Sequence, residues 1–151
     1  MRTKVGAFLE ESLRIEGIRR PATPEEVSKT IDFLGKVTLN IKDVTDLQAV
    51  YSPEAPLRDG AGMNVRVGKY TPPLGGSAIP KDLHDILVFA NHKRDPWRVH
   101  VLFESLHPFM DGNGRTGRTL WAWVMLADGR DPFKLPFLHW FYYQTLAECA
   151  K

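Results

Sequence analysis

The stretch that decides the fold is DPWRVHVLFESLHPFMDGNGRTGRTLWAWVMLA, residues 95–127. Asp95 and Pro96 form a helix start signal, because aspartate is a good N-cap and proline suits the first helical position. Apolar residues then recur at helical spacing up to His107, where the following proline disfavours helical dihedral angles. After a loop with glycines, residues 115–127 present almost no polar face. The pattern predicts two helices joined by a tight loop, the second of them deeply buried.

Similar signals predict helices on both sides of this unit. Thr23-Pro24-Glu25-Glu26 combines a capping residue, a proline at the first position and a capping box. The remaining expected helices cover about 3–16, 43–51, a segment after Pro80, and 136–147. Residues 52–80 are instead rich in proline and glycine, and within them the alternation at Met63–Tyr70 allows a short, irregular hairpin. The chain is therefore expected to be a mainly α domain with one loop or hairpin insertion.

Length and composition exclude several classes of protein. The 151 residues suit one compact domain, and 43% hydrophobic with 25% charged residues is the mixture of a globular protein. The 20 Lys and Arg against 18 Asp and Glu, a formal charge of +2, disfavour nucleic-acid and membrane partners. One cysteine excludes an internal disulfide and a cysteine-rich zinc site. Apolar runs too short for a membrane span and a charged N-terminal stretch predict a cytoplasmic protein.

Residues 107–118 concentrate groups that suit a bound polyphosphate. Gly112 and Gly114 allow backbone N–H groups to approach a ligand, and the helix that follows adds unpaired donors and a positive dipole. Asp111 beside phosphates is a natural magnesium ligand, and His107 is a titratable base. A glycine turn or a lone histidine is usually structural, but five such features within twelve residues disfavour that interpretation. The segment has neither a P-loop lysine nor an H-E-x-x-H zinc pattern.

Two arginines extend this pattern onto the second helix. Arg115 and Arg118 are three residues apart, so we expect both guanidinium groups to reach the same side of the helix. In-line attack on an α-phosphorus needs a base, positive charge on the phosphate oxygens, and groups that stabilise the departing pyrophosphate. One motif of this chain supplies all three.

These residues resemble the signature of the Fic family, HPFx(D/E)GNGRxxR, at every defining position. The likeness extends over residues 95–106 and through Trp123, and more loosely over the whole chain. It implies a Fic-type helical bundle with a short β-hairpin flap, and an enzyme that transfers AMP from magnesium-bound ATP to a Ser, Thr or Tyr hydroxyl of a target protein. It assigns His107 as the general base, Asp111 as the magnesium ligand and Phe109 as a core anchor. The residues it assigns to the nucleotide phosphates are Gly112, Asn113, Gly114, Arg115 and Arg118.

The first predicted helix carries a polar pair on its apolar stripe. Ser12 and Glu16 continue the face of Val5, Phe8 and Leu9, and a buried carboxylate normally needs a partner. Fraying near the following glycine would instead leave Glu16 in solvent. Ser12 and Glu16 resemble the family's inhibitory motif, (S/T)xxxE(G/N). That resemblance implies that Glu16 pairs with Arg118 and keeps the γ-phosphate of ATP from its productive place.

The domain organisation follows from this interpretation. Residues 1–20 would form an inhibitory helix region, and residues 21–151 the catalytic core of one compact domain. In the family an extended flap holds the target by main-chain pairing, and Asn64 to Leu74 is the best candidate, although an ordinary surface loop is equally compatible. The flap residues expected to bind the target are Val65, Arg66, Val67, Gly68, Lys69 and Tyr70.

Other functions stay open at this stage. Glu16 could orient a water that removes AMP from modified targets, or the phosphate cradle could serve the transfer of another phosphate-containing group. A catalytically inert binding module is a further alternative. ATP and a protein target are the expected partners, and both self-modification and a homo-oligomer are compatible with the sequence.

Overall fold

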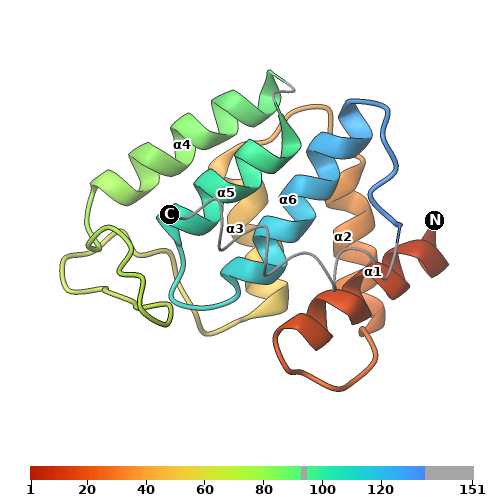
Figure 1. The fold of residues 1–151 in the computed structure, drawn as a ribbon, viewed down its shortest axis with the longest axis horizontal. Helices are drawn as coiled ribbons and strands as arrows, with labels where there is room; N and C mark the ends of the chain where they lie inside the picture. Colours follow the sequence, from red (N-terminus) through yellow and green to blue (C-terminus); the bar gives the residue numbers. More distant parts are fainter. Residues whose placement is uncertain (93–94, 135–151) are drawn as a thin grey trace.

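Six α-helices build the part of the chain that the computed structural model describes, residues 1–92 and 95–134 (Figure 1). The helices are α1 (Arg2–Ile15), α2 (Pro24–Leu34), α3 (Ile41–Tyr51), α4 (Ala78–Asn91), α5 (Pro96–Leu106) and α6 (Asn113–Ala127). The mainly α class expected from the sequence is confirmed. The helix expected over residues 136–147 lies outside the described residues.

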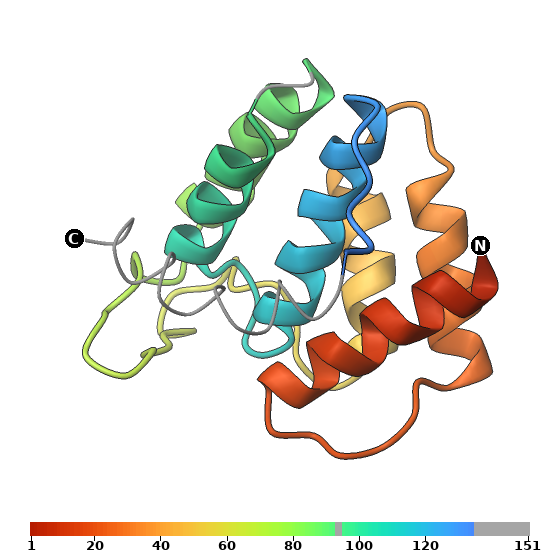
Figure 2. The ribbon, with the colours of Figure 1, turned by 45° about the vertical axis from the view of Figure 1, so that its right-hand side comes forward.

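Helix α6 is the centre of the bundle. It packs against α5 on one side and against α2 and α3 on the other, while α4 covers the outer side of α5 (Figures 1 and 2). Helix α1 crosses α2 and α6 (Figure 2). The core between the helices is a continuous apolar cluster that includes Phe8, Val44, Leu83, Phe103 and Leu120. The N-terminal end of α6 and the C-terminal end of α5 therefore meet inside a rigid frame.

Local sequence signals explain most helix boundaries. At α2 the Thr23 hydroxyl accepts from the Glu26 amide, and the Glu26 carboxylate accepts from the Thr23 amide, so the expected capping box is present. Helix α3 begins two residues earlier than expected, because Asn40 and Asp43 form a second capping box. Such reciprocal bonds satisfy amides that would otherwise lack partners at a helix start.

The first helix ends one residue before the expected position, and this changes the interpretation of Glu16. Because α1 stops at Ile15, Glu16 is its C-cap, with a side chain that is 37% exposed and therefore outside the buried stripe. The buried carboxylate of α1 is instead that of Glu11, which pairs with Arg14. Ser12, by contrast, is buried as expected.

The predicted hairpin is reduced to a tight turn. Residues 67 and 70 form one isolated antiparallel bridge, with mutual N–H to O distances of 2.9 Å between Val67 and Tyr70. Gly68 turns the chain with a positive φ of 58°, and Pro72 and Pro73 have no amide hydrogen with which to extend the ladder. Within residues 52–77, the loop between α3 and α4, no strand is longer than this bridge.

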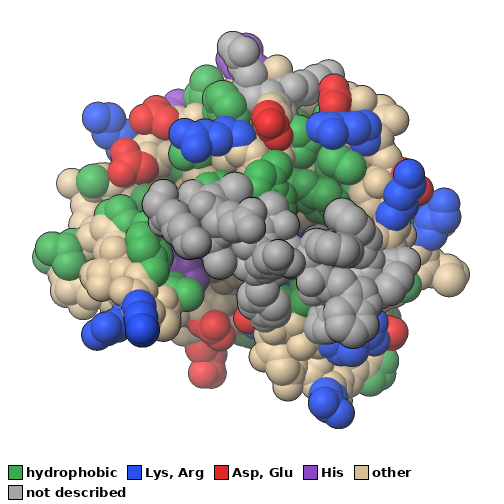
Figure 3. Space-filling view, in the orientation of Figure 1, with side chains coloured by type: hydrophobic (Ala, Val, Ile, Leu, Met, Phe, Trp, Pro, Cys, Tyr) green, Lys and Arg blue, Asp and Glu red, His purple; other side chains and the backbone are tan. Residues whose placement is uncertain are grey.

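Charges of both signs are mixed over the surface, and no described helix is long and apolar enough to span a bilayer. On the coloured part of one face, lysine and arginine side chains lie next to aspartate and glutamate side chains (Figure 3). This distribution agrees with the near-balanced composition.

Candidate active site

The candidate site is the turn between α5 and α6, and a neighbouring segment of the 52–77 loop holds this turn in place. The Arg58 amide donates to the Pro108 carbonyl at 2.9 Å, and the Met110 amide donates to the Pro56 carbonyl at 3.0 Å. Between these bonds, Leu57 and Phe109 form an antiparallel bridge. Phe109 is fully buried, as expected of a core anchor. The first half of the turn is thus paired like the edge of a sheet.

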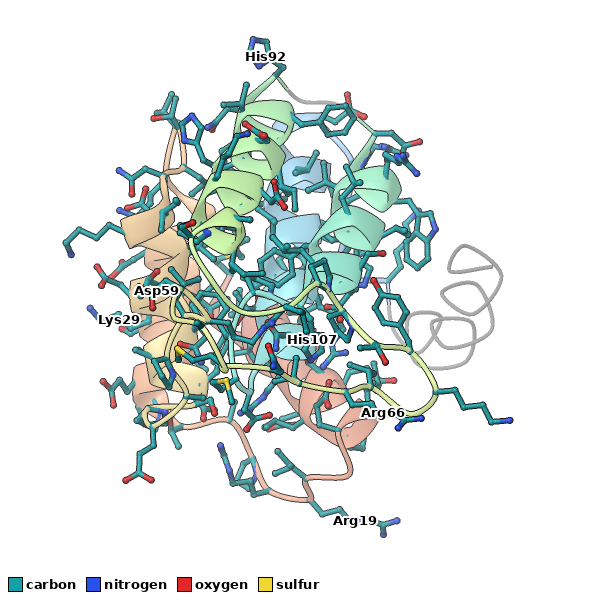
Figure 4. The ribbon with its side chains drawn as sticks, turned by 90° about the vertical axis from the view of Figure 1, so that its left-hand side faces the viewer. Arg19, Lys29, Asp59, Arg66, His92 and His107 are labelled. Carbon is teal, nitrogen blue, oxygen red and sulfur yellow. The ribbon has the colours of Figure 1, made fainter. Side chains whose placement is uncertain are left out.

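His107 lies where α5 stops. It is the one non-glycine residue with a positive φ, 52°, in the described chain. This left-handed geometry is costly for a residue with a Cβ atom and is maintained when surrounding contacts impose it. The residue is half-buried, and Figure 4 shows it inside the molecule among α5, α6 and the loop, whereas Arg66 lies on the outer edge of the loop.

The surroundings of His107 favour its neutral form. Burial lowers the pKa of the imidazole below its usual 6.5, and the positive charge of Arg58 acts in the same direction. The backbone carbonyl of Glu104 and the negative charges of Glu16 and Asp111 oppose the effect without cancelling it. At neutral pH the ring can therefore accept a proton, which is what a general base requires.

Asp111 is exposed in the same turn, and the end of α3 positions it. The Ser52 hydroxyl donates to Asp111 Oδ2 at 3.0 Å, and the buried Gln48 donates from Nε2 to the Asp111 carbonyl at 3.0 Å. No described cluster of three His, Cys, Asp or Glu side chains could hold a metal by itself. A single exposed carboxylate fits magnesium, which combines one or two carboxylates with phosphate oxygens and water.

The N-cap residue of α6 supplies no side-chain cap. Gly112 occupies this position with a φ of 76°, and it leaves the first amides without a bond from their own N-cap. A Cβ at this position would be strained by that φ and would lie 3.0 Å from the Ser52 Cβ. Uncapped amides and the positive end of the helix dipole form a site for an anion.

Asn113 braces the turn. Its Oδ1 accepts from the Phe109 amide at 2.9 Å, and its Nδ2 donates to the Phe109 carbonyl at 2.7 Å. Both polar atoms of this buried side chain are therefore engaged inside the turn. Its contribution to an anion site is thus limited to its backbone.

The two arginines of α6 contact different neighbours, contrary to the expectation that they would reach one side. Arg115 donates from Nη1 to the Tyr51 carbonyl at 2.6 Å, at the end of α3. Arg118 contacts α1 instead. Three residues turn an α-helix by about 300°, so the side chains diverge by roughly 60°, which is enough to select separate helices in a tight bundle.

Arg118 is 1% exposed and is bound by both residues of the predicted polar pair. Its Nε donates to the Ser12 hydroxyl at 2.7 Å, and its Nη2 donates to the Ser12 carbonyl at 3.1 Å and to Glu16 Oε1 at 2.6 Å. The expected ion pair between Glu16 and Arg118 is present. A Cβ at Gly114 would collide with Glu16 Oε1, so this carboxylate lies against the first turn of α6.

Sequence reasoning missed Glu104, one helical turn before His107. Its Oε1 is buried without a hydrogen-bond partner within the described residues, at a place where a Cβ on Gly117 would collide with it. Burial raises the pKa of Glu104 to about 8, although Arg118 lowers it and Glu16 raises it further. Nothing in the spacing distinguishes this glutamate from a solvated one, because its burial results from the packing of α5 on α6.

Arg58, Gln48 and Ser52 were also missed. Arg58 is 0% exposed although it lies in the proline- and glycine-rich stretch, where charged residues are usually solvated. Ser52 could be recognised in the sequence as a helix stop before Pro53, but its contact with Asp111 is made across 59 residues. No sequence signal indicates that these residues contact the turn.

The predicted flap residues are mostly exposed. Arg66 bonds to the Gly68 carbonyl within its own turn at 3.0 Å. Tyr70 reaches α5, where its hydroxyl donates to the Ser105 carbonyl at 2.6 Å. The structure thus brings one end of the flap close to the helix that carries His107.

Comparison with known proteins shows similarity to one family and to curated proteins from nematodes. A profile of the Fic/DOC family matches residues 19–125. The chain is 35% identical over 80 residues to "Protein adenylyltransferase fic-1" of Caenorhabditis elegans, and equally to the protein of that name from Caenorhabditis briggsae. Each match covers 48% of this chain and 16% of the nematode protein.

Proposed function

Because the chain belongs to the Fic/DOC family, we propose that it is a protein adenylyltransferase, which transfers AMP from ATP to a target hydroxyl and releases pyrophosphate. The observation that carries the proposal is the turn between α5 and α6. It has a base with a lowered pKa at one end, an uncapped helix N-terminus at the other, and an exposed carboxylate between them. The names of the two nematode relatives support the same class of reaction.

His107 removes the proton from the attacking Ser, Thr or Tyr hydroxyl. As the new O–P bond forms at the α-phosphorus, the bond to the bridging oxygen of pyrophosphate breaks. The amides of the first turn of α6 stabilise the negative charge on the phosphate oxygens, with Arg115 as the adjacent cation. Asp111 would hold magnesium, which supplies positive charge on the phosphates when bound.

Glu16 keeps this site inhibited. Its carboxylate lies against the first turn of α6 and binds Arg118, so it takes both the place and the partner that an ATP phosphate would use. A carboxylate and a phosphate are attracted by the same helix end, and two anions do not share one site. We infer that residues 1–20 act as a built-in inhibitory segment whose release permits transfer.

The test is mass spectrometry of a lysate incubated with magnesium–ATP and purified Glu16→Gly. The expected result is a mass increase of one AMP on hydroxyl side chains, self-modification included, that is absent with Glu16→Gly/His107→Ala. Glu10→Gln is the control, since it removes a carboxylate from the same helix without touching Arg118 and without a glycine in the helix interior, and it should resemble the wild type. Absence of any modified protein with Glu16→Gly, together with no binding of magnesium–ATP, would favour an inert binding module.

The same preparations separate addition of AMP from its removal. If the wild-type protein releases AMP from a modified target and Glu16→Gly does not, Glu16 orients a water and the chain is a hydrolase. If the mass added differs from that of AMP, the transferred group is another phosphate-containing one.

A further inference from the structure

Arg58 is the most completely enclosed charged side chain near the site, and backbone carbonyls from two regions surround it. Its Nε donates to the His107 carbonyl at 2.7 Å and its Nη2 to the Leu106 carbonyl at 2.8 Å. Its Nη1 donates to the carbonyls of Pro73 at 2.8 Å and Met63 at 3.1 Å. One guanidinium therefore joins the end of α5 to Pro73, near the end of the flap (residues 64–74), and to Met63, directly before its start.

The contacts at α5 satisfy a specific need. The last carbonyls of a helix have no partner within the helix, and they carry the negative end of its dipole. At α5 these include the carbonyls of Leu106 and His107, and a cation is the favoured partner there. Arg58 thus acts as a side-chain cap supplied from another segment. It also holds the carbonyl of the residue whose φ is left-handed.

The contacts at the flap set its two ends. Besides the two side-chain bonds, the Gly76 amide donates to the Arg58 carbonyl at 3.0 Å. Between these fixed ends the flap turns at residues 67–70, and the Tyr70 hydroxyl makes a separate bond to α5. Arg58 therefore supplies several of the bonds that set the position of the flap relative to His107.

We propose that Arg58 is a positioning residue for the transfer reaction, which holds the backbone of His107 and the flap in register so that a target hydroxyl bound at the flap reaches the imidazole. This inference rests on the proposed function for its target. The structural part of the inference, that one side chain joins the flap to the backbone of His107, does not depend on the proposed function.

Arg58 also has a chemical effect that a merely structural residue would lack. The charged and polar groups that act on His107 are Arg58, Glu16, Asp111 and the Glu104 carbonyl, and among them Arg58 favours the neutral ring. Loss of its charge should raise the pKa of His107. The limb of the pH–rate profile on the acid side should then move to higher pH.

The choice of arginine is also informative. The planar guanidinium offers five N–H donors in a fixed fork, and four carbonyls from two regions use that geometry. A lysine at this position would keep the charge but has one nitrogen, which cannot span both regions. Arg58→Lys therefore separates the effect of the positive charge from the effect of the guanidinium geometry.

The experiment compares Arg58→Lys, Arg58→Met and Arg98→Met with the parent, all in the Glu16→Gly background. Arg98 is an exposed arginine on α5, outside the flap and the turn, and is the matched control. Three quantities are measured: amide hydrogen exchange over residues 58–76, the pKa of the His107 ring by NMR, and kcat and KM for a target peptide.

We expect faster exchange in both Arg58 variants, and a higher His107 pKa in Arg58→Met but not in Arg58→Lys. The kcat of Arg58→Lys should fall by about tenfold or more, since a misplacement of roughly 1 Å can cost on the order of 100-fold in rate. If Arg58→Met does not fold, Arg58→Lys alone still tests exchange and kcat.

Unchanged exchange and an unchanged His107 pKa in folded Arg58→Met, or parental kcat in Arg58→Lys, would overturn the inference. If exchange and pKa change as expected but the parent itself transfers no AMP, the proposed function fails while the coupling of flap and base by Arg58 stands.

Discussion

Two buried arginines flank the turn between α5 and α6, and a glutamate distinguishes them. Arg58 is held by backbone carbonyls of α5 and the loop, whereas Arg118 is held by the hydroxyl and carbonyl of Ser12 and also by a glutamate that is 37% exposed. Main-chain carbonyls cannot move away without rearranging the backbone. A partly exposed carboxylate at a helix end can leave by rotation of one side chain. The Arg58 side of the site is therefore fixed, and the Arg118 side can be switched.

The base belongs to the fixed side, and its loss should have the largest effect. In the Glu16→Gly background, His107→Ala should lower the rate of AMP incorporation by about 10²–10⁴-fold, the usual contribution of a general base. The measurement is transfer of label from radiolabelled ATP. Transfer at the parental rate would mean that another group removes the proton.

Loss of Arg58 should destabilise the fold more than loss of a surface arginine. Arg58→Met leaves carbonyls unpaired, and a buried carbonyl without a partner costs about 1–3 kcal/mol, so we expect a decrease of roughly 3 kcal/mol in the free energy of unfolding. Arg66→Met should change it by less than about 0.5 kcal/mol. Urea denaturation measures both values, and equal values would contradict the distinction between a fixed arginine and an exposed one.

Release of the switchable side should raise activity at a moderate cost in stability. Glu16→Gly should increase AMP incorporation by about 5- to 150-fold, the range of typical coupling free energies. The free energy of unfolding should fall by about 1–3 kcal/mol, because the buried Arg118 loses one hydrogen-bond partner. Assays of both quantities on one preparation provide the check. Incorporation equal to that of the wild type would show that Glu16 does not inhibit transfer.

Glu104 should make stability depend on pH. Burial raises the pKa of Glu104 from 4.5 to about 8, so between these values the folded state binds more protons than the unfolded state. The free energy of unfolding should therefore decrease as pH rises through this window, and Glu104→Gln should remove that contribution.

The pH dependence of stability that Glu104 causes should also change when Glu16 is removed. Because the charge of Glu16 raises the pKa of Glu104, Glu16→Gly should lower the upper end of the window. Urea denaturation at pH 5, 6.5 and 8 provides the measurement. Identical slopes for the wild type and Glu104→Gln would show that this carboxyl does not titrate in the folded state as inferred.

Local features of the chain were predictable where neighbouring residues decide them. The capping box of Thr23 and Glu26 and the stop of α5 at His107 before proline depend on short-range chemistry. The hairpin prediction was less accurate, because alternation over Met63–Tyr70 indicates strand propensity, whereas the turn glycine and the two prolines limit the pairing to one bridge.

The sequence alone determined the helical class and the motif from His107 to Arg118, and the pairing of Glu16 with Arg118 was expected from the resemblance of Ser12 and Glu16 to the family's inhibitory motif. The tertiary structure decided which side chains surround that motif. Arg58, Ser52 and Glu104 meet it across packed elements, and a residue's burial there depends on helices that lie far away in the chain. Spacing along one helix predicts which residues share its face, but the neighbour that each face contacts is set by the packing of the whole bundle.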